Sequence, residues 1–322
     1  MSRSAVAIGL VMLAMLAIAS LFVPAADLLA VARSDRALAA SILWELRVPR
    51  MLLAILYGGV LGASGAAIQA LFGNPLASPD ITGTSGGAAL GAVVSAYLLG
   101  ASTPLGFAAG GIAGAGGALA LLLLVAGPRA ESATLLLAGL AISTLTGAAL
   151  AMALALAPSP YAFYDALDWL MGSLVDRSLP QAALAATGCA IAAALLGWQA
   201  PALDRLALGE EVAATLGYDL AHTRLAVVVG TAIGVGTCVS VCGAIGFIGL
   251  VAPVFARRLT GHHPGRAMLP AGIIGAALLL AADMLVRLAP LGRILPVGAI
   301  TAAVGAPIFV WLIAGSRWRT DR

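Results

Sequence analysis

The sequence predicts an all-α, polytopic membrane protein, and three observations carry that prediction. Hydrophobic residues fill 61% of the 322 positions and charged residues only 10%, whereas a typical soluble domain has about 25% charged residues. The mean hydropathy is +1.05. Uncharged runs long enough to cross a bilayer, which takes about 20 residues, recur along the chain. A soluble globular domain is therefore excluded.

Glycines and prolines divide the uncharged runs into about ten transmembrane helices, which form one membrane domain over residues 1–322. The stretch 100–104 is the expected hairpin in the longest run, and a Gly-rich break at 243–246 interrupts another run. The first run is long for a signal peptide, so we expect an uncleaved first helix rather than a cleaved leader. The expected spans are 5–24, 50–72, 82–99, 105–126, 133–153, 179–200, 224–243, 246–259, 268–288 and 296–314.

All 17 basic residues are arginines, which bears on both topology and chemistry. With the N-terminus inside, ten arginines fall in cytoplasmic segments and seven in outer segments, as the positive-inside rule favours. The tail arginines Arg317 and Arg319 indicate a cytoplasmic C-terminus as well. A chain without lysine has no Walker A loop, so we expect no ATP hydrolysis and no enzyme activity. The scattered charge provides no basic stripe for nucleic acid.

Two segments combine breaks in the backbone with polar residues. In residues 69–80, Gln69, Asn74 and Pro75 precede a second proline and an aspartate. In residues 243–258, glycines and a proline interrupt an apolar run just before two arginines. Irregular backbone at membrane depth is tolerated only where protein or a water-filled cavity satisfies it. These segments are therefore candidates for a pathway, and an ordinary cytoplasmic turn is the alternative for the first.

The most charge-dense internal segment lies between the sixth and seventh spans and predicts a short amphipathic helix. Glu210 and Glu211 would open this helix, where negative charge suits the positive end of the helix dipole. Gly217 would close it. Apolar residues four apart place an apolar stripe on one face, which favours a protein partner on the cytoplasmic side. A helix lying on the membrane surface is the alternative, although paired acids and the lack of lysine disfavour it.

Together these segments resemble the permease family of type II ABC importers, which take up ferric siderophores, haem and cobalamin. The resemblance covers nearly the whole chain. Three positions depart from the family pattern: Val254 stands in place of a usual histidine, Ile294 in place of a common glutamate, and Gly73 where arginine or glutamate often occurs. The matching stretches are 47–50, 69–79, 169–174, 208–211, 243–257, 282–283, 295–298 and 305–307.

The resemblance implies a type II permease fold of ten helices and a set of partners. A second permease subunit, either an identical copy or a paralogue, would form a dimer around the pathway in the bacterial inner membrane. A periplasmic substrate-binding protein would deliver the cargo, and two separate ABC ATPase subunits would power transport. Both termini would be cytoplasmic, and no cofactor is implied. The segment 203–221 would hold the coupling helix that docks on the ATPase.

The resemblance also assigns roles to individual residues. The residues that couple to the ATPase would be Leu208, Gly209, Glu210, Glu211, Val212, Leu216 and Gly217. The arginines that meet the binding protein would be Arg47, Arg50 and Arg287, with lipid headgroup contact as the alternative for the first two. The residues of the pathway or gate would be Gln69, Asn74, Pro75, Ser132, Ala133, Gly246 and Pro253.

Asp283 is an acid inside an expected span, and such an acid marks a functional site by default. Because Arg287 lies one helical turn away, we expect a structural ion pair rather than a proton relay. No metal site is expected, since two sulfurs without a third ligand make a poor site and loop histidines are solvated. The residues concerned are Cys189, Cys238, Cys242, His222, His262 and His263.

The sequence thus predicts the membrane-spanning permease of an ABC importer for an iron chelate, with a ferric siderophore as the favoured cargo. Haem and cobalamin are the alternatives within the same family. An ion-driven secondary transporter is the alternative from another class. That alternative requires a central acid without a partner and has no use for a coupling helix.

Overall fold

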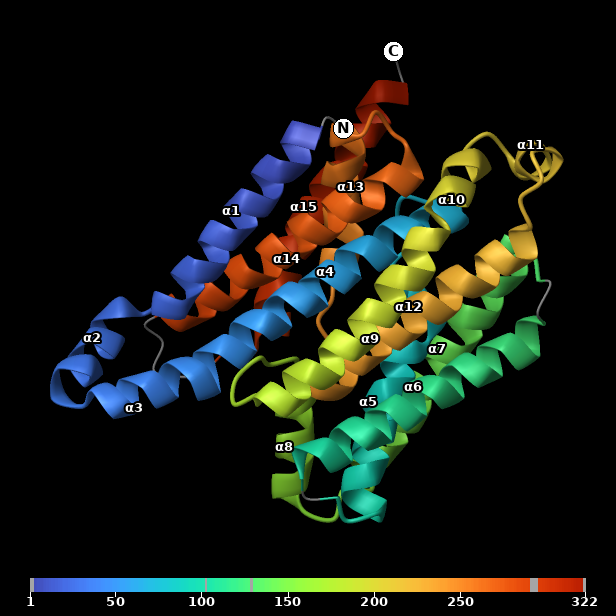
Figure 1. Ribbon diagram of the computed structural model, residues 1–322. Helices are drawn as coiled ribbons and strands as arrows, with labels where there is room; N and C mark the ends of the chain where they lie inside the picture. Colours follow the sequence, from blue (N-terminus) through green and yellow to red (C-terminus); the bar gives the residue numbers. More distant parts are fainter. Residues whose placement is uncertain (1–2, 102, 128–129, 290–294, 321–322) are drawn as a thin grey trace.

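The computed structural model describes residues 3–101, 103–127, 130–289 and 295–320, and every regular element in them is a helix. Long helices form a tilted bundle joined by short connections (Figure 1). The helices are α1 (Arg3–Phe22), α2 (Ala25–Ser34), α3 (Arg36–Ser41), α4 (Val48–Leu71), α5 (Thr84–Leu98), α6 (Pro104–Ala126), α7 (Ser132–Ala155), α8 (Pro160–Leu170), α9 (Leu179–Trp198), α10 (Ala200–Leu206), α11 (Glu210–Thr215), α12 (Leu220–Cys242), α13 (Ile248–Leu259), α14 (Pro264–Leu288) and α15 (Val297–Thr320). A π-helical turn, Ile42–Arg47, joins α3 to α4, and a 3₁₀ turn, Pro79–Thr82, precedes α5.

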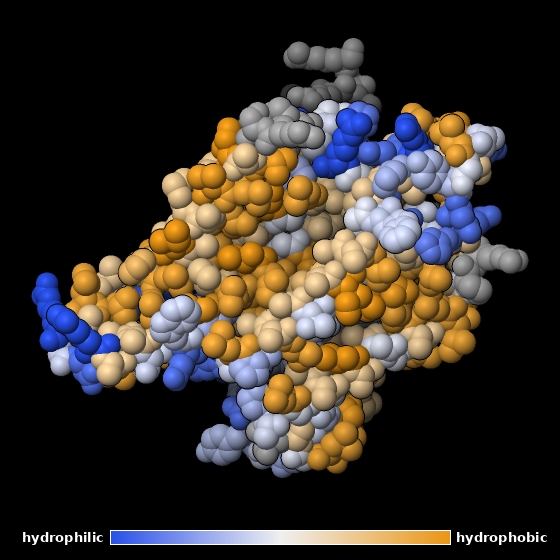
Figure 2. Space-filling view, viewed as in Figure 1, coloured by the Kyte–Doolittle hydropathy of each residue, from blue (hydrophilic) through white to orange (hydrophobic). Residues whose placement is uncertain are grey.

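The two ends of the bundle differ in the short helices that they carry. The start of α1, the last turns of α15, and α11 lie toward the upper end in Figure 1, which we call the α11 end. The helices α2, α3 and α8 lie toward the opposite end, which we call the α8 end. Hydrophobic residues cover most of the surface between the two ends, and hydrophilic residues gather near α11 and around α2 and α3 (Figure 2). This distribution is typical of a membrane protein.

Each of the ten expected spans contains a helix, although the number of membrane crossings stays a prediction. Seven helical stretches of the described chain are long and apolar enough to cross a membrane. α5, with 15 residues, and α13, with 12 residues, are shorter. In α15 the described apolar part is Val297–Ile308. The family departure at Ile294 lies outside the described residues.

The helix that contains the second expected span starts earlier than that span. Residues Arg36–Leu71 form one helical stretch of 36 residues, whereas the expected span begins at 50. The expected span begins at 50 because Arg47 and Arg50 precede the uncharged run, and its start in the membrane stays a prediction. The helix nevertheless continues through them, since both side chains find partners within the protein. The sequence did not predict the helices α2, α3 and α8, because they are too short to form the long apolar runs that indicate spans.

Small residues let α4 and α14 pack with their backbones in contact. A Cβ atom added at Gly58 would overlap the carbonyl oxygen of Gly275, and one added at Gly62 would overlap that of Ala271. Lipid provides no hydrophobic drive for helix association, so close packing of this kind holds membrane helices together. The glycine spacing in α4 therefore reflects a real helix contact.

We expect Gly62→Ala to destabilise the protein, because the added methyl group meets backbone that cannot move aside. Overpacking of this kind costs about 1–3 kcal/mol. The matched control is Gly117→Ala in α6, where an added Cβ has nothing within 4 Å. Thermal unfolding in detergent would measure both. Equal midpoints for the two variants would contradict the close contact between α4 and α14.

Candidate functional site

The candidate site starts at α11, the short helix that the sequence predicts between two spans. It covers Glu210–Thr215, with Gly209 before it at φ 105° and Gly217 after it at φ 85°. Positive φ strains residues that carry a side chain, so glycine suits both ends. The Gly217 amide donates to the carbonyl of Ala214 at 2.9 Å and closes the helix. The predicted start and end of this helix are confirmed.

An apolar stripe on and beside α11 faces outward. Leu208, Val212 and Leu216 are 60%, 43% and 55% exposed, whereas Ala213 is buried. Figure 2 shows hydrophobic residues among hydrophilic ones at this end of the molecule. Exposed apolar residues spaced along one face of a short helix are typical of a surface that docks another protein.

Glu210 connects α11 to two long helices. One carboxylate oxygen lies 2.7 Å from Nη2 of Arg224 in the first turns of α12. The other carboxylate oxygen lies 3.3 Å from Oγ of Ser132, the first residue of α7. The same Ser132 Oγ is 3.3 Å from the carbonyl oxygen of Leu71 at the end of α4. The structure thus brings together a predicted coupling residue and a predicted gate residue, while Ala133, next along α7, is exposed.

Arg224 is a site residue that the sequence interpretation missed. It is one of the ten arginines expected in cytoplasmic segments, yet its side chain is only 9% exposed. The one available signal was an arginine at the head of a long apolar run, where a charge needs a partner. Glu211 is exposed to solvent, and Glu210 is also exposed but pairs with Arg224.

The predicted pathway residues around the end of α4 make two kinds of contact, a local turn and a long-range hydrogen bond. Oδ1 of Asn74 accepts a hydrogen bond from the Leu76 amide at 2.9 Å, and Pro75 is exposed. These two residues therefore fit the turn alternative. The Gln69 side chain instead donates to the carbonyl of Leu250 in α13 at 3.3 Å. Gln69 thus joins the two segments that the sequence singled out for their broken backbone.

Tyr57 holds the Gly-rich break that precedes α13. Its fully buried hydroxyl donates to the carbonyl of Gly243 at 3.0 Å and accepts from the Ile245 amide at 3.2 Å. These bonds satisfy backbone groups that the interrupted helix leaves without helical partners. Gly246 is half-buried, and Pro253 is buried inside α13. The sequence interpretation missed Tyr57; a lone tyrosine in an apolar span was the signal, since a buried hydroxyl usually has a partner.

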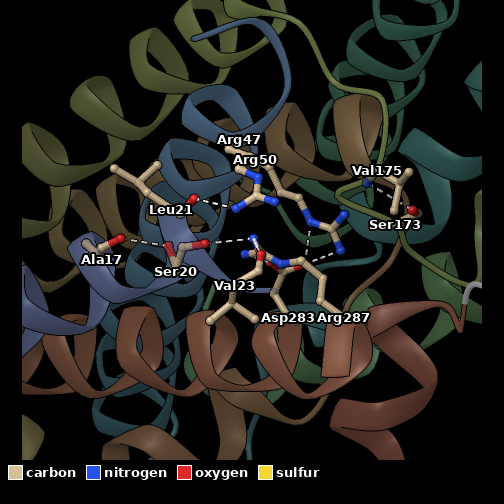
Figure 3. A network of polar contacts seen from close by, with 10 residues as sticks. All are labelled: Ala17, Ser20, Leu21, Val23, Arg47, Arg50, Ser173, Val175, Asp283 and Arg287. Carbon is tan, nitrogen blue, oxygen red and sulfur yellow. Dashed lines mark hydrogen bonds and ion pairs between the residues drawn. The ribbon is translucent and has the colours of Figure 1, made fainter. Parts of the chain in front are cut away.

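At the α8 end, Arg50 and Arg287 converge on the carboxylate of Asp283 (Figure 3). Asp283 is fully buried; Arg50 approaches to 2.7 Å, and Arg287 pairs from one turn further along α14. Arg287 also donates to the carbonyl of Ser20 in α1 at 2.8 Å. The expected ion pair between Asp283 and Arg287 is confirmed. Arg50, from α4, is a second partner that the sequence did not indicate.

Arg47 completes the cluster shown in Figure 3. It donates to the carbonyls of Leu21 at 2.7 Å, in the last turn of α1, and of Pro24 at 3.4 Å, just before α2. All three predicted docking arginines therefore bind groups of this chain, and their contact with a binding protein stays a prediction. An acid held by two arginines does not fit the unpartnered acid that an ion-driven transporter requires.

Within the described residues, no group of three metal-ligating side chains comes together. The sulfur atoms of Cys189 and Cys238 lie 3.5 Å apart between α9 and α12, and Cys242 is also buried. The histidines His262 and His263 are exposed in the loop after α13.

The chain is similar to known proteins over most of its length. Residues 6–315 match the FecCD transport family. The vitamin B12 import system permease protein of Citrobacter koseri is 39% identical over 277 residues, 85% of this chain and 83% of that protein. The counterpart of Vibrio cholerae is 37% identical over 283 residues, 84% of this chain and 82% of that protein.

A solved structure supports the same assignment of the fold. It is an inward-facing conformation of a protein assigned as a metal-chelate type ABC transporter, with a TM-score of 0.86 and 25% identity. The match covers 98% of this chain and 100% of that chain. The bundle and the comparisons together define a membrane-spanning permease of an ABC importer. The chain belongs to the FecCD transport family.

Replacing Asp283 is expected to destabilise the protein, because Arg50 and Arg287 would keep their charges without a counter-charge. Asp283→Asn should lower the free energy of unfolding by about 3–5 kcal/mol, the usual effect of breaking a buried ion pair. Asp168→Asn, an exposed position on α8, is the control. Thermal unfolding in detergent measures both, and a midpoint of Asp283→Asn equal to that of the control would refute the pairing.

Proposed function

We propose that the chain is the transmembrane subunit of an importer for cobalamin, powered by a separate ATPase that docks on α11. Cobalamin is proposed as the cargo because the chain is 37–39% identical to vitamin B12 import permeases over more than four fifths of its length. A ferric siderophore, the cargo that the sequence favours, is the second candidate. The resemblance to a metal-chelate type transporter supports that candidate.

The docking of an ATPase on α11 rests on two observations. The chain contains no lysine, so it has no Walker A loop of its own and needs an external source of power. Leu208, Val212 and Leu216 offer an exposed apolar stripe at one end of the bundle. A cleft on the ATPase would bury this stripe and move α11 when the two ATPase subunits close on ATP.

The orientation in the membrane follows from the same assignment. We place the α11 end in the cytoplasm and the α8 end in the periplasm, so that both termini are cytoplasmic. The arginine-rich tail, Arg317 and Arg319, supports this placement. The α8 end would then receive cargo from a periplasmic binding protein. The net positive charge of its arginine cluster suits an acidic partner surface.

A second permease subunit would complete the pathway. Most residues of the apolar helix α7 are not buried within the chain, and Leu137, Leu140 and Leu145 are exposed on it. A partner helix covering part of this face would leave a central pathway lined by small, weakly polar side chains. Such a lining holds a large rigid chelate loosely, so the cargo is released when the subunits rock from outward-open to inward-open.

Acidic substitutions in the α11 stripe are expected to release the ATPase. Val212→Asp combined with Leu216→Asp removes the burial of two apolar side chains, worth about 1.5–3 kcal/mol each, so binding should weaken by about 100-fold or more. Co-purification of the ATPase with the full complex measures this loss. Tyr161→Asp, on exposed α8 at the opposite end, is the control and should retain the ATPase. Retention by the double variant would contradict docking on α11.

Transport by the complete complex decides the cargo. Proteoliposomes that contain the chain, its ATPase and its binding protein should accumulate radiolabelled cyanocobalamin only when ATP is present. A ferric siderophore and haem serve as the competing cargoes. If only the siderophore is taken up, the assignment of cobalamin as cargo is wrong but the assignment as an ABC importer stands. Uptake by the chain without an ATPase would overturn the assignment as an ABC importer.

A further inference from the structure

The carboxylate of Glu210 is the meeting point of four segments. It belongs to α11, pairs with Arg224 of α12 at 2.7 Å, and lies 3.3 Å from the Ser132 hydroxyl at the start of α7. That hydroxyl is also 3.3 Å from the carbonyl of Leu71, the last residue of α4. The outward stripe of α11 leaves this carboxylate directed toward the bundle. Contact with a partner and contact with the bundle therefore use different faces of the same short helix.

The burial of Arg224 makes it difficult to separate Glu210 from α12. The Arg224 side chain is 9% exposed, whereas that of Glu210 is 49% exposed, so the buried partner is the one that always carries charge. Nε of Arg224 is buried without a hydrogen-bond partner, and Glu210 is its ion-pair partner among the described residues. If α11 moved away alone, Arg224 would be left as an uncompensated buried charge, which is strongly unfavourable. A displacement of α11 therefore draws the head of α12 with it.

Ser132 adds a choice between two acceptors. A serine hydroxyl has one hydrogen to donate, and two acceptors, the Glu210 carboxylate and the Leu71 carbonyl, lie at the same 3.3 Å. The hydroxyl can therefore bond to α11 or to the end of α4, but it cannot donate fully to both. A small movement of α11 is enough to change which bond forms. The start of α7 is thereby linked to the position of α11.

We propose that Glu210 is the positioning residue that transmits movement of α11 to α12 and α7. The proposal rests on the proposed function, in which an ATPase moves α11, and it adds the atoms through which the movement reaches the bundle. Arg224 follows the carboxylate as a tethered charge. Ser132 exchanges its hydrogen bond between Glu210 and Leu71 as α11 shifts. Docking of the ATPase itself depends on the outward stripe and not on this link.

The test uses the full complex of permease, ATPase and binding protein in proteoliposomes. The main variant is Glu210→Gln, and the control is Glu131→Gln, an exposed glutamate beside Ser132. We expect both variants to co-purify with the ATPase. The cargo imported per ATP hydrolysed should fall about tenfold in Glu210→Gln, within the range of typical coupling energies, and stay unchanged in Glu131→Gln. An equal ratio in the two variants would overturn the proposal.

A second pair of variants separates transmission from folding. Glu210→Gln leaves Arg224 unpaired, so a loss of stability alone could reduce transport. Glu210→Gln combined with Arg224→Gln removes both charges and should recover the thermal midpoint while the import ratio stays low. Recovery of the ratio together with the midpoint would show a merely structural role and overturn the proposal. Glu210→Arg combined with Arg224→Glu restores an ion pair and should raise the ratio above that of Glu210→Arg alone.

The two proposals fail in different ways. If the unaltered complex does not hold an ATPase, or imports cargo without one, the proposed function is wrong. If the unaltered complex imports cargo with ATP and the neutral double variant couples as well as it does, only the role of Glu210 is wrong. Ser132→Ala tests whether the hydrogen bond between Ser132 and Glu210 contributes to the transmission. It should lower the import ratio in the native background and have a smaller effect when Glu210 is already glutamine, because an amide oxygen is a weaker acceptor than a carboxylate.

Discussion

The pairing of buried arginines with carboxylates is the interaction on which the arrangement of this permease depends. Arg224 and Arg287 have side chains that are each 9% exposed, and an arginine cannot shed its charge as a buried carboxylic acid can. A buried charge without a partner costs several kcal/mol, so each guanidinium must lie where a carboxylate meets it. At the α8 end this requirement joins α1, α4 and α14 around Asp283. At the α11 end it fixes α11 against α12 through Glu210.

A second requirement, that backbone groups in apolar surroundings be satisfied, explains how the broken span before α13 persists. The hydroxyl of Tyr57 bonds two backbone groups within the break, at Gly243 and Ile245, and Gln69 bonds the carbonyl of Leu250 in the first turn of α13. Both side chains project from α4, so one long helix supports the irregular segment along its length. The same helix meets Ser132 at its last residue. α4 therefore connects the broken span with the surroundings of α11.

The sequence predicted what depends on local patterns and missed what depends on contacts across the bundle. Apolar runs located the long helices, and two glutamates with a closing glycine located α11. The pair of Asp283 with Arg287 was predictable because one helical turn separates them. Arg50 meets Asp283 across 233 positions of sequence, and Tyr57 meets Gly243 across 186. No spacing rule reaches that far, so the role of α4 as the common support emerged only from the structure.

The two ion-pair clusters differ in burial, and the two ends of the molecule are therefore held with different strength. Asp283 is fully buried and lies between helices that are packed backbone to backbone. Glu210 is half exposed and lies on a helix of six residues outside the bundle. Water screens the attraction at Glu210 far more than that at Asp283, so the same type of bond is weaker there. The α11 end is therefore held by the weaker ion pair, while the arginine cluster joins α1, α4 and α14 around the fully buried Asp283.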